Sequence, residues 1–382
     1  MNDKKLLFFQ GSYFDNSLLA LSRWPSGTLP VLSIVQDTYE LGTGQKPGFA
    51  QPIVFFRLDP CLSLLFHSPS VAPSLKSLRL RIPARPIARP LCSMPPSATS
   101  AYSYDLRPLP ELEFLDISTC SLLDDEFDMI LVHFPSLKHL ILDGCSLFRG
   151  EGDWNELGKR CALAGVRRAK QRQKALKSWV DANRAGTSLD IQEDPSNQQR
   201  SAKRGRKGLA TATISLRGSR PVASTSSQLL ISEVSLQRAA KIRILPSPPT
   251  LETLSITVAP WVKPDKYSML RAEFEAGWTE GMALLAVTKA RLRSSVKNGY
   301  RIMRFSSSFR FGLETLQDDS LEEGLEGLED VGPEDVPAFG ASSQGDIRLS
   351  PAVLCFSGPG RGPNHEENCG HSVAWEVMED DL

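Results

Sequence analysis

The sequence lacks long hydrophobic runs and paired cysteines. None of its apolar stretches approaches the roughly 18 residues that a membrane span needs. The segment Leu6–Phe9 is also far too short for the core of a signal peptide. The seven cysteines, odd in number, form no Cys-x-x-Cys pair, which is typical of a reduced intracellular protein. We therefore expect an intracellular protein, in the nucleus or the cytoplasm, that does not contact a membrane.

Catalytic signatures are missing as well. There is no G-x-S-x-G, no G-x-x-x-x-G-K-[ST] and no H-E-x-x-H. Asp124 and Asp125 are better explained as helix caps than as an acid–base pair. His365, Cys369 and His371 have the spacing H-x3-C-x-H, but this triplet lacks a fourth ligand for zinc. We expect no enzymatic activity, no metal and no cofactor.

Net charge is zero, with 44 basic and 44 acidic residues, so the overall charge favours neither nucleic acid nor membrane as a partner. The charges are unevenly distributed, with basic residues dominating 159–220 and acidic residues dominating 314–335.

What the sequence does contain is a repeat between Leu109 and Leu147. The pattern P-x-L-x-x-L-x-[IL]-x-x-C-x-L occurs twice at an offset of 25 positions (112 to 137, 120 to 145). This is the signature of a leucine-rich repeat with Cys in place of Asn. Leucines two positions apart point to one face of a strand, so each copy predicts a short strand with a buried side. A helix between the two copies is predicted by five apolar residues near a 3.6-residue period: Leu123, Phe127, Ile130, Leu131 and Phe134.

Two further copies of the first half of the pattern occur at Pro73–Ile82 and Pro249–Val258, and Thr28–Ile34 is a worn one. The four clear copies predict neighbouring parallel strands with Leu78, Leu115, Leu140 and Leu254 in one buried row. The fold class is therefore α/β, an irregular leucine-rich-repeat solenoid with parallel strands and flanking helices, interrupted by disordered insertions.

Other segments have simpler predictions. Helices are predicted after Asp59-Pro60, over 153–185 with Asp153 and Glu156 as a capping box, and over 267–297. Residues 300–305 alternate as a strand does, 83–108 predict an extended loop, and 371–377 predict a last strand or a docking segment.

These predictions divide the chain into six parts: a poorly defined amino-terminal segment (1–50), a repeat region with a basic helix (51–185), a disordered basic linker (186–228), a repeat continuation with a long amphipathic helix (229–312), an acidic disordered linker (313–347) and a carboxyl-terminal docking segment (348–382).

Two basic features have alternative interpretations. Lys203, Arg204, Arg206 and Lys207 form either a nuclear-import signal or part of a soluble charged linker. The basic half of the helix over 153–185 is either a phosphate-binding face or a solvated one, and the second interpretation is favoured.

A binding surface is predicted where strand side chains point away from the core. Exposed Phe114 and Ile141 would form an apolar centre with a polar rim, the composition that interfaces favour. The predicted partner-binding residues are Arg79, Arg81, Phe114, Asp116, Lys138, His139 and Ile141.

Several segments together resemble a family of fungal F-box or leucine-rich-repeat proteins. They are the two core repeats with Phe56–Leu62, Gly158–Ala169, Gly277–Gly281 and Trp375–Leu382. The resemblance implies a receptor that holds a client protein on its solenoid while an F-box helix bundle grips the adaptor of a cullin-type ubiquitin ligase. An F-box opening of the form Leu-Pro-x-Glu is not evident, because Leu29-Pro30-Val31 is followed by Leu32. The alternative function is a nuclear scaffold whose basic insertion contacts nucleic acid or acidic proteins.

Overall fold

A computed structural model describes the following parts of the chain: 11–23, 29–35, 58–69, 71–92, 109–145, 153–187, 241–306, 325, 327–332 and 350–378. The predicted nuclear-import residues Lys203, Arg204, Arg206 and Lys207, and nearly all of the two predicted linkers, lie outside these ranges. Within the described ranges, no helix combines the length and the apolar character needed to cross a bilayer.

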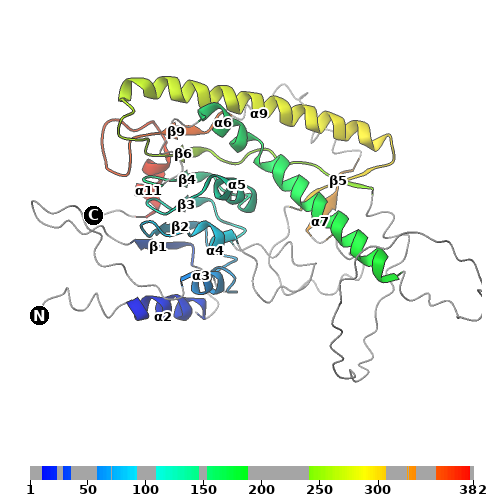
Figure 1. The fold of residues 1–382 in the computed structure, drawn as a ribbon, viewed down its shortest axis with the longest axis horizontal. Helices are drawn as coiled ribbons and strands as arrows, with labels where there is room; N and C mark the ends of the chain where they lie inside the picture. The colour runs from blue at the N-terminus through cyan, green and yellow to red at the C-terminus, as the bar shows by residue number, and fades with distance from the viewer. Residues whose placement is uncertain are drawn as a thin grey trace, which may run out of the picture.

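A six-stranded parallel sheet is the centre of the fold (Figure 1). Its order is β1-β2-β3-β4-β6-β9, so the strands follow one another in the sheet as they do in the chain. The bounds are β1 Val31–Val35, β2 Ser77–Arg81, β3 Phe114–Asp116, β4 His139–Ile141, β6 Thr253–Ser255 and β9 Val353–Cys355. The predicted order of the four clear copies is confirmed, and the worn copy at 28–34 supplies β1.

The register of the sheet aligns one leucine from each strand. Leu78 pairs with Leu115, Leu115 with Leu140, and Leu140 with Leu254, as predicted. Leu32 and Leu354 extend the row at its two ends. The four central leucines are fully buried, and they belong to the main hydrophobic core together with apolar residues of the flanking helices.

Short helices cover the leucine side of the sheet: α3 Leu58–Phe66, α4 Ala88–Cys92 and α5 Asp124–His133, while α2 Gly11–Ser22 packs on α3. The prediction of an extended loop over 83–108 is wrong where α4 forms. The prediction that Asp124 or Asp125 caps this helix is also wrong. Helix α5 begins at Asp124, and its N-cap residue is Leu123. The Leu123 N–H donates a hydrogen bond to the Glu126 carboxylate at 2.9 Å, while Asp124 pairs with Arg160.

The predicted helix over 153–185 is two helices, α6 Trp154–Ala162 and α7 Ala164–Thr187, separated at Leu163. Asp153 caps the first by accepting a hydrogen bond from the Glu156 N–H at 2.9 Å, as expected. The long predicted helix is α9 Tyr267–Val296, preceded by a short 3-10 turn, Pro264–Lys266. A Cβ added to Gly158 would lie 2.0 Å from the Phe274 carbonyl oxygen, so α6 and α9 pack backbone against backbone.

A smaller sheet lies beside α7, in the order β5-β7-β8: β5 Ile242–Ile244, β7 Arg301–Phe305 and β8 Leu328–Asp330. Helix α7 contributes Leu176, Trp179 and Val180 to a second core with these strands. The strand predicted over 300–305 is thereby confirmed.

The last predicted strand, 371–377, is instead a helix, α11 Gly370–Val377. The docking alternative describes it better, because α11 packs on β4 and β6. The final strand of the sheet is β9, held by Phe356 against Trp154 of α6 and Tyr267 of α9, with ring centroids 5.2 and 5.0 Å apart.

Candidate functional site

The side of the sheet opposite the leucine row carries the predicted partner-binding residues, and we call it the strand face. Two rows of side chains cross it in register. One row contains Ser77, Phe114, His139, Thr253 and Val353, and the other contains Arg79, Asp116, Ile141, Ser255 and Cys355. The predicted residues therefore do lie together, on or next to β2, β3 and β4.

The prediction that Phe114 and Ile141 are exposed is wrong. Their side chains are 2% and 0% exposed, because α11 covers them. Ala374 forms a small apolar cluster with both residues, and Val373 and Met378 pack against it. The apolar centre of the strand face is thus occupied by the chain's own carboxyl-terminal helix.

The amino-terminal turn of α11 approaches the strands very closely. A Cβ added to Gly370 would lie 3.0 Å from the hydroxyl oxygens of both Thr253 and Ser255. Only a residue without a side chain fits this distance without displacing its neighbours. Gly370 therefore allows the helix to start directly on β6.

Arg79 and Asp116, also predicted as exposed, are buried in a cluster of charges. Asp116 Oδ2 accepts hydrogen bonds from Arg79 Nε at 3.2 Å and Arg81 Nη2 at 2.6 Å. Asp116 Oδ1 accepts from the N–H and the hydroxyl of Ser118 at 3.0 and 2.6 Å. The carboxylate is fully buried, so these charges hold β2 and β3 together rather than forming an open polar rim.

The amino-terminal end of the strand face is more open among the described residues. Val31, Ser33 and Val35 of β1 are exposed, and the Arg81 side chain is 21% exposed. Lys138 and His139 are half-buried. Lys138 Nζ pairs with Glu113 Oε2 at 3.0 Å, and His139 Nδ1 lies 3.1 Å from Thr253 Oγ1.

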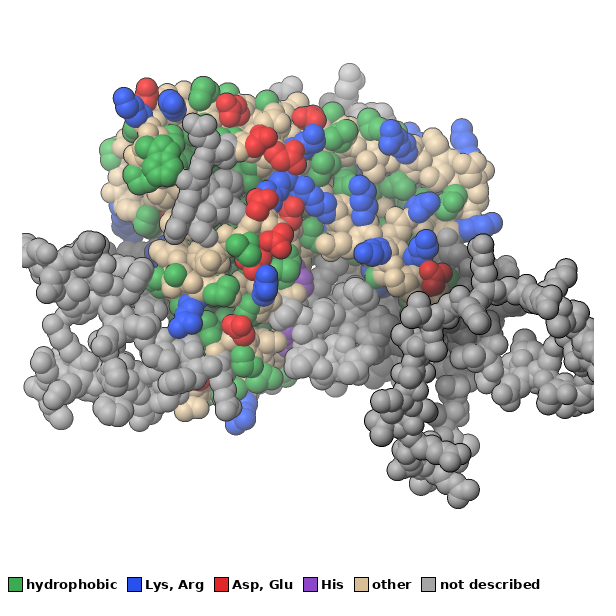
Figure 2. Space-filling model, in the orientation of Figure 1, with side chains coloured by type: hydrophobic (Ala, Val, Ile, Leu, Met, Phe, Trp, Pro, Cys, Tyr) green, Lys and Arg blue, Asp and Glu red, His purple; other side chains and the backbone are tan. Residues whose placement is uncertain are grey.

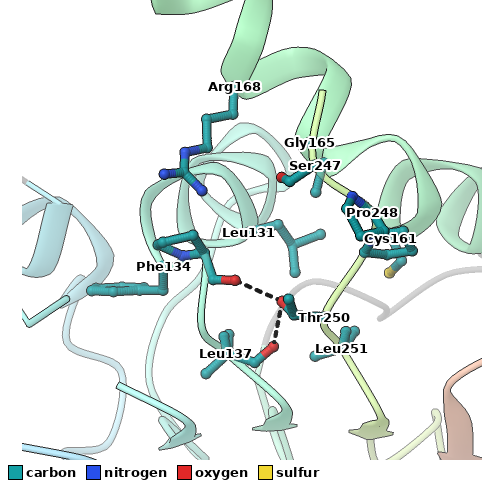
Figure 3. A pocket seen from close by; sticks show the side chains of 13 residues that line it. Leu131, Phe134, Leu137, Cys161, Gly165, Arg168, Ser247, Pro248, Thr250 and Leu251 are labelled. Atoms are coloured by element: carbon teal, nitrogen blue, oxygen red, sulfur yellow. Dashed lines mark hydrogen bonds between the residues drawn. The ribbon is translucent and has the colours of Figure 1, made fainter. Parts of the chain in front are cut away.

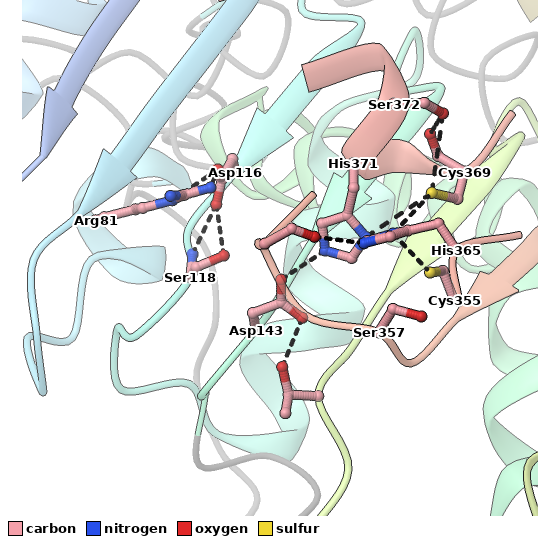
Figure 4. Close-up of polar contacts among 12 residues, drawn as sticks. Arg81, Asp116, Ser118, Asp143, Cys355, Ser357, His365, Cys369, His371 and Ser372 are labelled. Atoms are coloured by element: carbon pink, nitrogen blue, oxygen red, sulfur yellow. Dashed lines mark hydrogen bonds and ion pairs between the residues drawn. The ribbon is translucent and has the colours of Figure 1, made fainter. Parts of the chain in front are cut away.

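Where β9 ends, two cysteines and two histidines come together (Figure 4). Cys355 ends β9, His365 lies in the following loop, Cys369 precedes α11, and His371 is in its first turn. One potential ligand atom from each residue lies within 4.8 Å of the others. The Nδ1 atom of His365 is 3.6 Å from both sulfur atoms, and Nδ1 of His371 is 3.8 Å from Cys369 Sγ.

The opposite ring nitrogens of both histidines face oxygen atoms. His371 Nε2 lies 2.6 Å from Asp143 Oδ2, and His365 Nε2 lies 2.7 Å from the Gly360 carbonyl oxygen. Asp143 Oδ1 in turn accepts a hydrogen bond from Thr257 Oγ1 at 2.8 Å. The cluster is thus held to the loops that follow β4 and β6.

Electrostatics distinguishes Cys369 from the other thiols. A hydrogen bond with Cys355, outweighing burial and aided by hydrogen bonds from Ser372, lowers the pKa of Cys369 to about 6. Burial instead raises the pKa of Cys120 and of Cys161 to about 12. Burial opposes protonation of His371, but the hydrogen bond to Asp143 and contacts with Cys355 outweigh it and raise the pKa to about 9. All seven cysteines are described, and none of them forms a disulfide.

The expectation that the His365, Cys369 and His371 triplet lacks a fourth ligand is wrong, because β9 places Cys355 beside it. Sequence reasoning missed Cys355 because it lies ten positions before His365, in a strand that was not predicted. A signal was present in the composition: two of the seven cysteines and two of the five histidines lie within 355–371.

A pocket between α5, the α6–α7 junction and the segment before β6 offers no room for a ligand (Figure 3). Its volume is about 20 Å³, the space of a single water molecule. Thr250 Oγ1 donates hydrogen bonds to the carbonyl oxygens of Pro135 and Leu137 at its edge, at 2.8 and 3.0 Å.

The basic half of α7 is partly used inside the protein. Arg167 pairs with Asp128 of α5 at 2.7 Å, and the guanidinium of Arg168 lies 3.9 Å from the centre of the Phe305 ring. Lys170, Lys174 and Lys177 are exposed on one side of the helix. Figure 2 shows that basic side chains gather over α7 and the carboxyl-terminal half of α9.

Comparison of this chain with protein-family models, with curated proteins and with solved structures finds no match. The geometry of the strand face and of the Cys/His cluster therefore carries the functional argument.

Proposed function

We propose that this protein is a protein-interaction module of the leucine-rich-repeat type, which holds a client protein on its strand face. The observation that carries the proposal is α11 itself, an amphipathic helix seated on Phe114 and Ile141 through Ala374. A surface that accommodates one helix this closely has the shape and the apolar character to accept a segment of another protein.

The repeat type is supported by the register of the sheet. Parallel strands with one leucine per strand in a continuous row, and with a helix between successive strands, are the arrangement of stacked leucine-rich repeats. Rigid neighbouring strands present side chains to a partner with little ordering cost. The open end at β1 is where a client would first make contact.

A pair of matched variants tests this proposal. Val35→Glu places a charge on the exposed end of the strand face, where the side chain is 43% exposed. Val287→Glu places the same charge on α9 at a side chain that is 46% exposed. Pull-down from cell extract, compared by mass spectrometry, should show specific partners that Val35→Glu loses and Val287→Glu retains. Equal recovery of all partners by both variants would contradict the proposal.

The ubiquitin-ligase connection is a narrower form of the same proposal. It places this module as the substrate-receptor part of an F-box subunit, as the resemblance implies. Co-purification with the cullin adaptor tests it, and client capture without the adaptor would leave the binding module standing while removing the ligase role.

The second candidate is a nuclear scaffold that contacts nucleic acid or acidic proteins. The observation that favours it is the basic surface over α7 and the end of α9, where Lys170, Lys174 and Lys177 are exposed and α9 has no acidic residue after Glu280. Binding to duplex DNA that weakens steeply with salt, and that Lys170→Glu with Lys174→Glu abolishes, is the expected result. Binding that is insensitive to salt or to the two substitutions would remove this candidate.

A further inference from the structure

We propose that Cys355, His365, Cys369 and His371 bind one Zn²⁺ ion in a closed tetrahedral site that fastens α11 to the strand face. The inference does not depend on the proposed client binding, because it concerns a metal site within the chain.

The distances within the cluster match this geometry. Zinc lies about 2.3 Å from cysteine sulfur and about 2.0–2.1 Å from histidine nitrogen, so sulfur and nitrogen atoms on a tetrahedral ion are about 3.5–3.6 Å apart. The three sulfur–nitrogen separations here are 3.6, 3.6 and 3.8 Å. Such a set of four converging ligands, two of them cysteines and two histidines, is a common donor set of structural zinc sites.

The histidines present the correct nitrogen atoms. Because the Asp143 carboxylate and the Gly360 carbonyl can only accept hydrogen bonds, the Nε2 atoms that face them carry the proton. In the neutral imidazole that binds a metal, a proton on Nε2 leaves Nδ1 as the lone-pair donor, and the Nδ1 atoms are the ones that face the sulfurs (Figure 4). A carboxylate behind a metal-binding imidazole is a frequent outer-shell partner of zinc ligands.

The charge balance and the burial of the four residues also fit a zinc site. Zinc binds cysteine as the thiolate and histidine as the neutral imidazole, so any proton on these four ligand atoms is released to solvent, and the two thiolates neutralise the two positive charges of the ion. Cys355, Cys369 and His371 are buried and His365 is half-buried. Four protein ligands leave no coordination position for a substrate, which makes the site structural rather than catalytic.

The position of the ligands gives the site its role. Cys355 belongs to β9, whereas Cys369 and His371 lie at the start of α11. One ion therefore ties the helix to the sheet at the end where Gly370 touches β6. The other contact of α11 with the strand face is a small apolar cluster, so we expect the metal to strengthen the attachment of the helix over Phe114 and Ile141.

The first test is the metal content of the full chain, purified without chelator and measured by mass spectrometry. We expect about one Zn²⁺ per chain, and a fall to near zero in Cys355→Ser and in Cys369→Ser. Cys61→Ser is the matched control, because Cys61 is also buried but lies on α3, and it should keep its zinc. Metal-free wild-type protein with a Cys355–Cys369 disulfide would overturn the proposal, as would an equal loss of zinc from Cys61→Ser.

A second test does not depend on the folding of variants that lack a ligand. Asp143→Asn keeps all four ligands and removes only the carboxylate behind His371, so zinc affinity should fall about 10- to 100-fold. Co²⁺ added to the metal-free wild-type chain should give the strong visible absorption of a tetrahedral thiolate site. A weak octahedral spectrum, or unchanged zinc affinity in Asp143→Asn, would contradict the proposed site.

Hydrogen exchange tests whether the metal holds α11 on the strand face. Hydrogen exchange of residues 370–378 should become faster when a chelator removes the metal, while exchange in β3 and β4 stays slow. If exchange in α11 is unchanged by metal removal, the ion does not hold the helix on the strand face.

Discussion

The two faces of the six-stranded sheet are buried in different ways. On the leucine side, β2, β3 and β4 are flanked by helices near them in the sequence, α3, α4 and α5, and the row from Leu78 to Leu254 enters one large core. On the strand face, Phe114 and Ile141 are covered by a helix that begins at Gly370, in a contact where Asp143 and His371 are 228 positions apart. A repeat therefore specifies its own inner face, but it carries no information about a distant segment that docks on the outer one.

Asp116→Ala tests the strand face most severely. The substitution leaves Arg79 and Arg81 without their shared carboxylate in a buried position, which should lower the free energy of unfolding by about 3–5 kcal/mol. Asp181→Ala, at an exposed position of α7, is the control and should change the free energy of unfolding by less than about 0.5 kcal/mol. Urea unfolding measures both, and a loss below about 1 kcal/mol for Asp116→Ala would mean that the charges are not buried in solution.

Leu140→Ala tests the leucine side. It removes a fully buried side chain from the central row and should lower the free energy of unfolding by about 2–5 kcal/mol through lost transfer energy and a cavity. The same substitution at Leu284 of α9, which is 41% exposed, should change the free energy of unfolding by less than about 0.5 kcal/mol. Similar denaturation midpoints for the two variants would show that the row is not the core of the fold.

Two neighbouring residues of β3 allow the two faces of the sheet to be compared directly, because Leu115 and Phe114 point to opposite faces. Phe114→Ala combined with Val373→Ala should show a coupling energy of about 0.5–3 kcal/mol, since α11 joins the two side chains in one cluster. Leu115→Ala combined with Val373→Ala should be additive. Additivity in both pairs would indicate that α11 is not docked in solution.

The smallest effect is expected at the edge of the strand face. Lys138→Ala removes the ion pair with Glu113, in which the two side chains are 41% and 39% exposed. Such a pair contributes about 0.2–1 kcal/mol, and the contribution should shrink as salt concentration rises. A larger, salt-independent loss of unfolding free energy would show that Lys138 has a buried role.

Five of the six strands of the main sheet, all except β9, were predictable from the sequence because the information for them is local. The spacing of Leu112, Leu115 and Ile117 predicts, within six residues, which side of β3 points inward. The second copy of the pattern, at 137–142, predicts the adjacent strand β4 in the same way. The helices after Asp59 and Asp153 were predictable for the same reason, since proline and cap residues act within one turn. Strand order then followed from the order of the copies.

The exposure of the strand face and the Cys/His cluster were not predictable in this way. Phe114 and Ile141 have the alternation of outward residues, and only the docking of α11 buries them. Cys355 becomes a ligand because β9 pairs with β6, and that pairing joins segments about one hundred positions apart. Information about such contacts lies in the three-dimensional arrangement, not in any window of sequence.

The order of contacts along the chain also has a consequence for how the protein assembles. Lys138 and Glu113 are 25 positions apart, His139 and Thr253 are 114 apart, and His371 is 228 positions from Asp143. Because closing a longer loop costs more chain entropy, and because α11 is synthesised after the strands that it covers, we expect β2, β3 and β4 to form before α11 docks on them. A nascent chain would therefore display Phe114 and Ile141 to water until residues 370–378 are made, so this face should be the one that a chaperone protects.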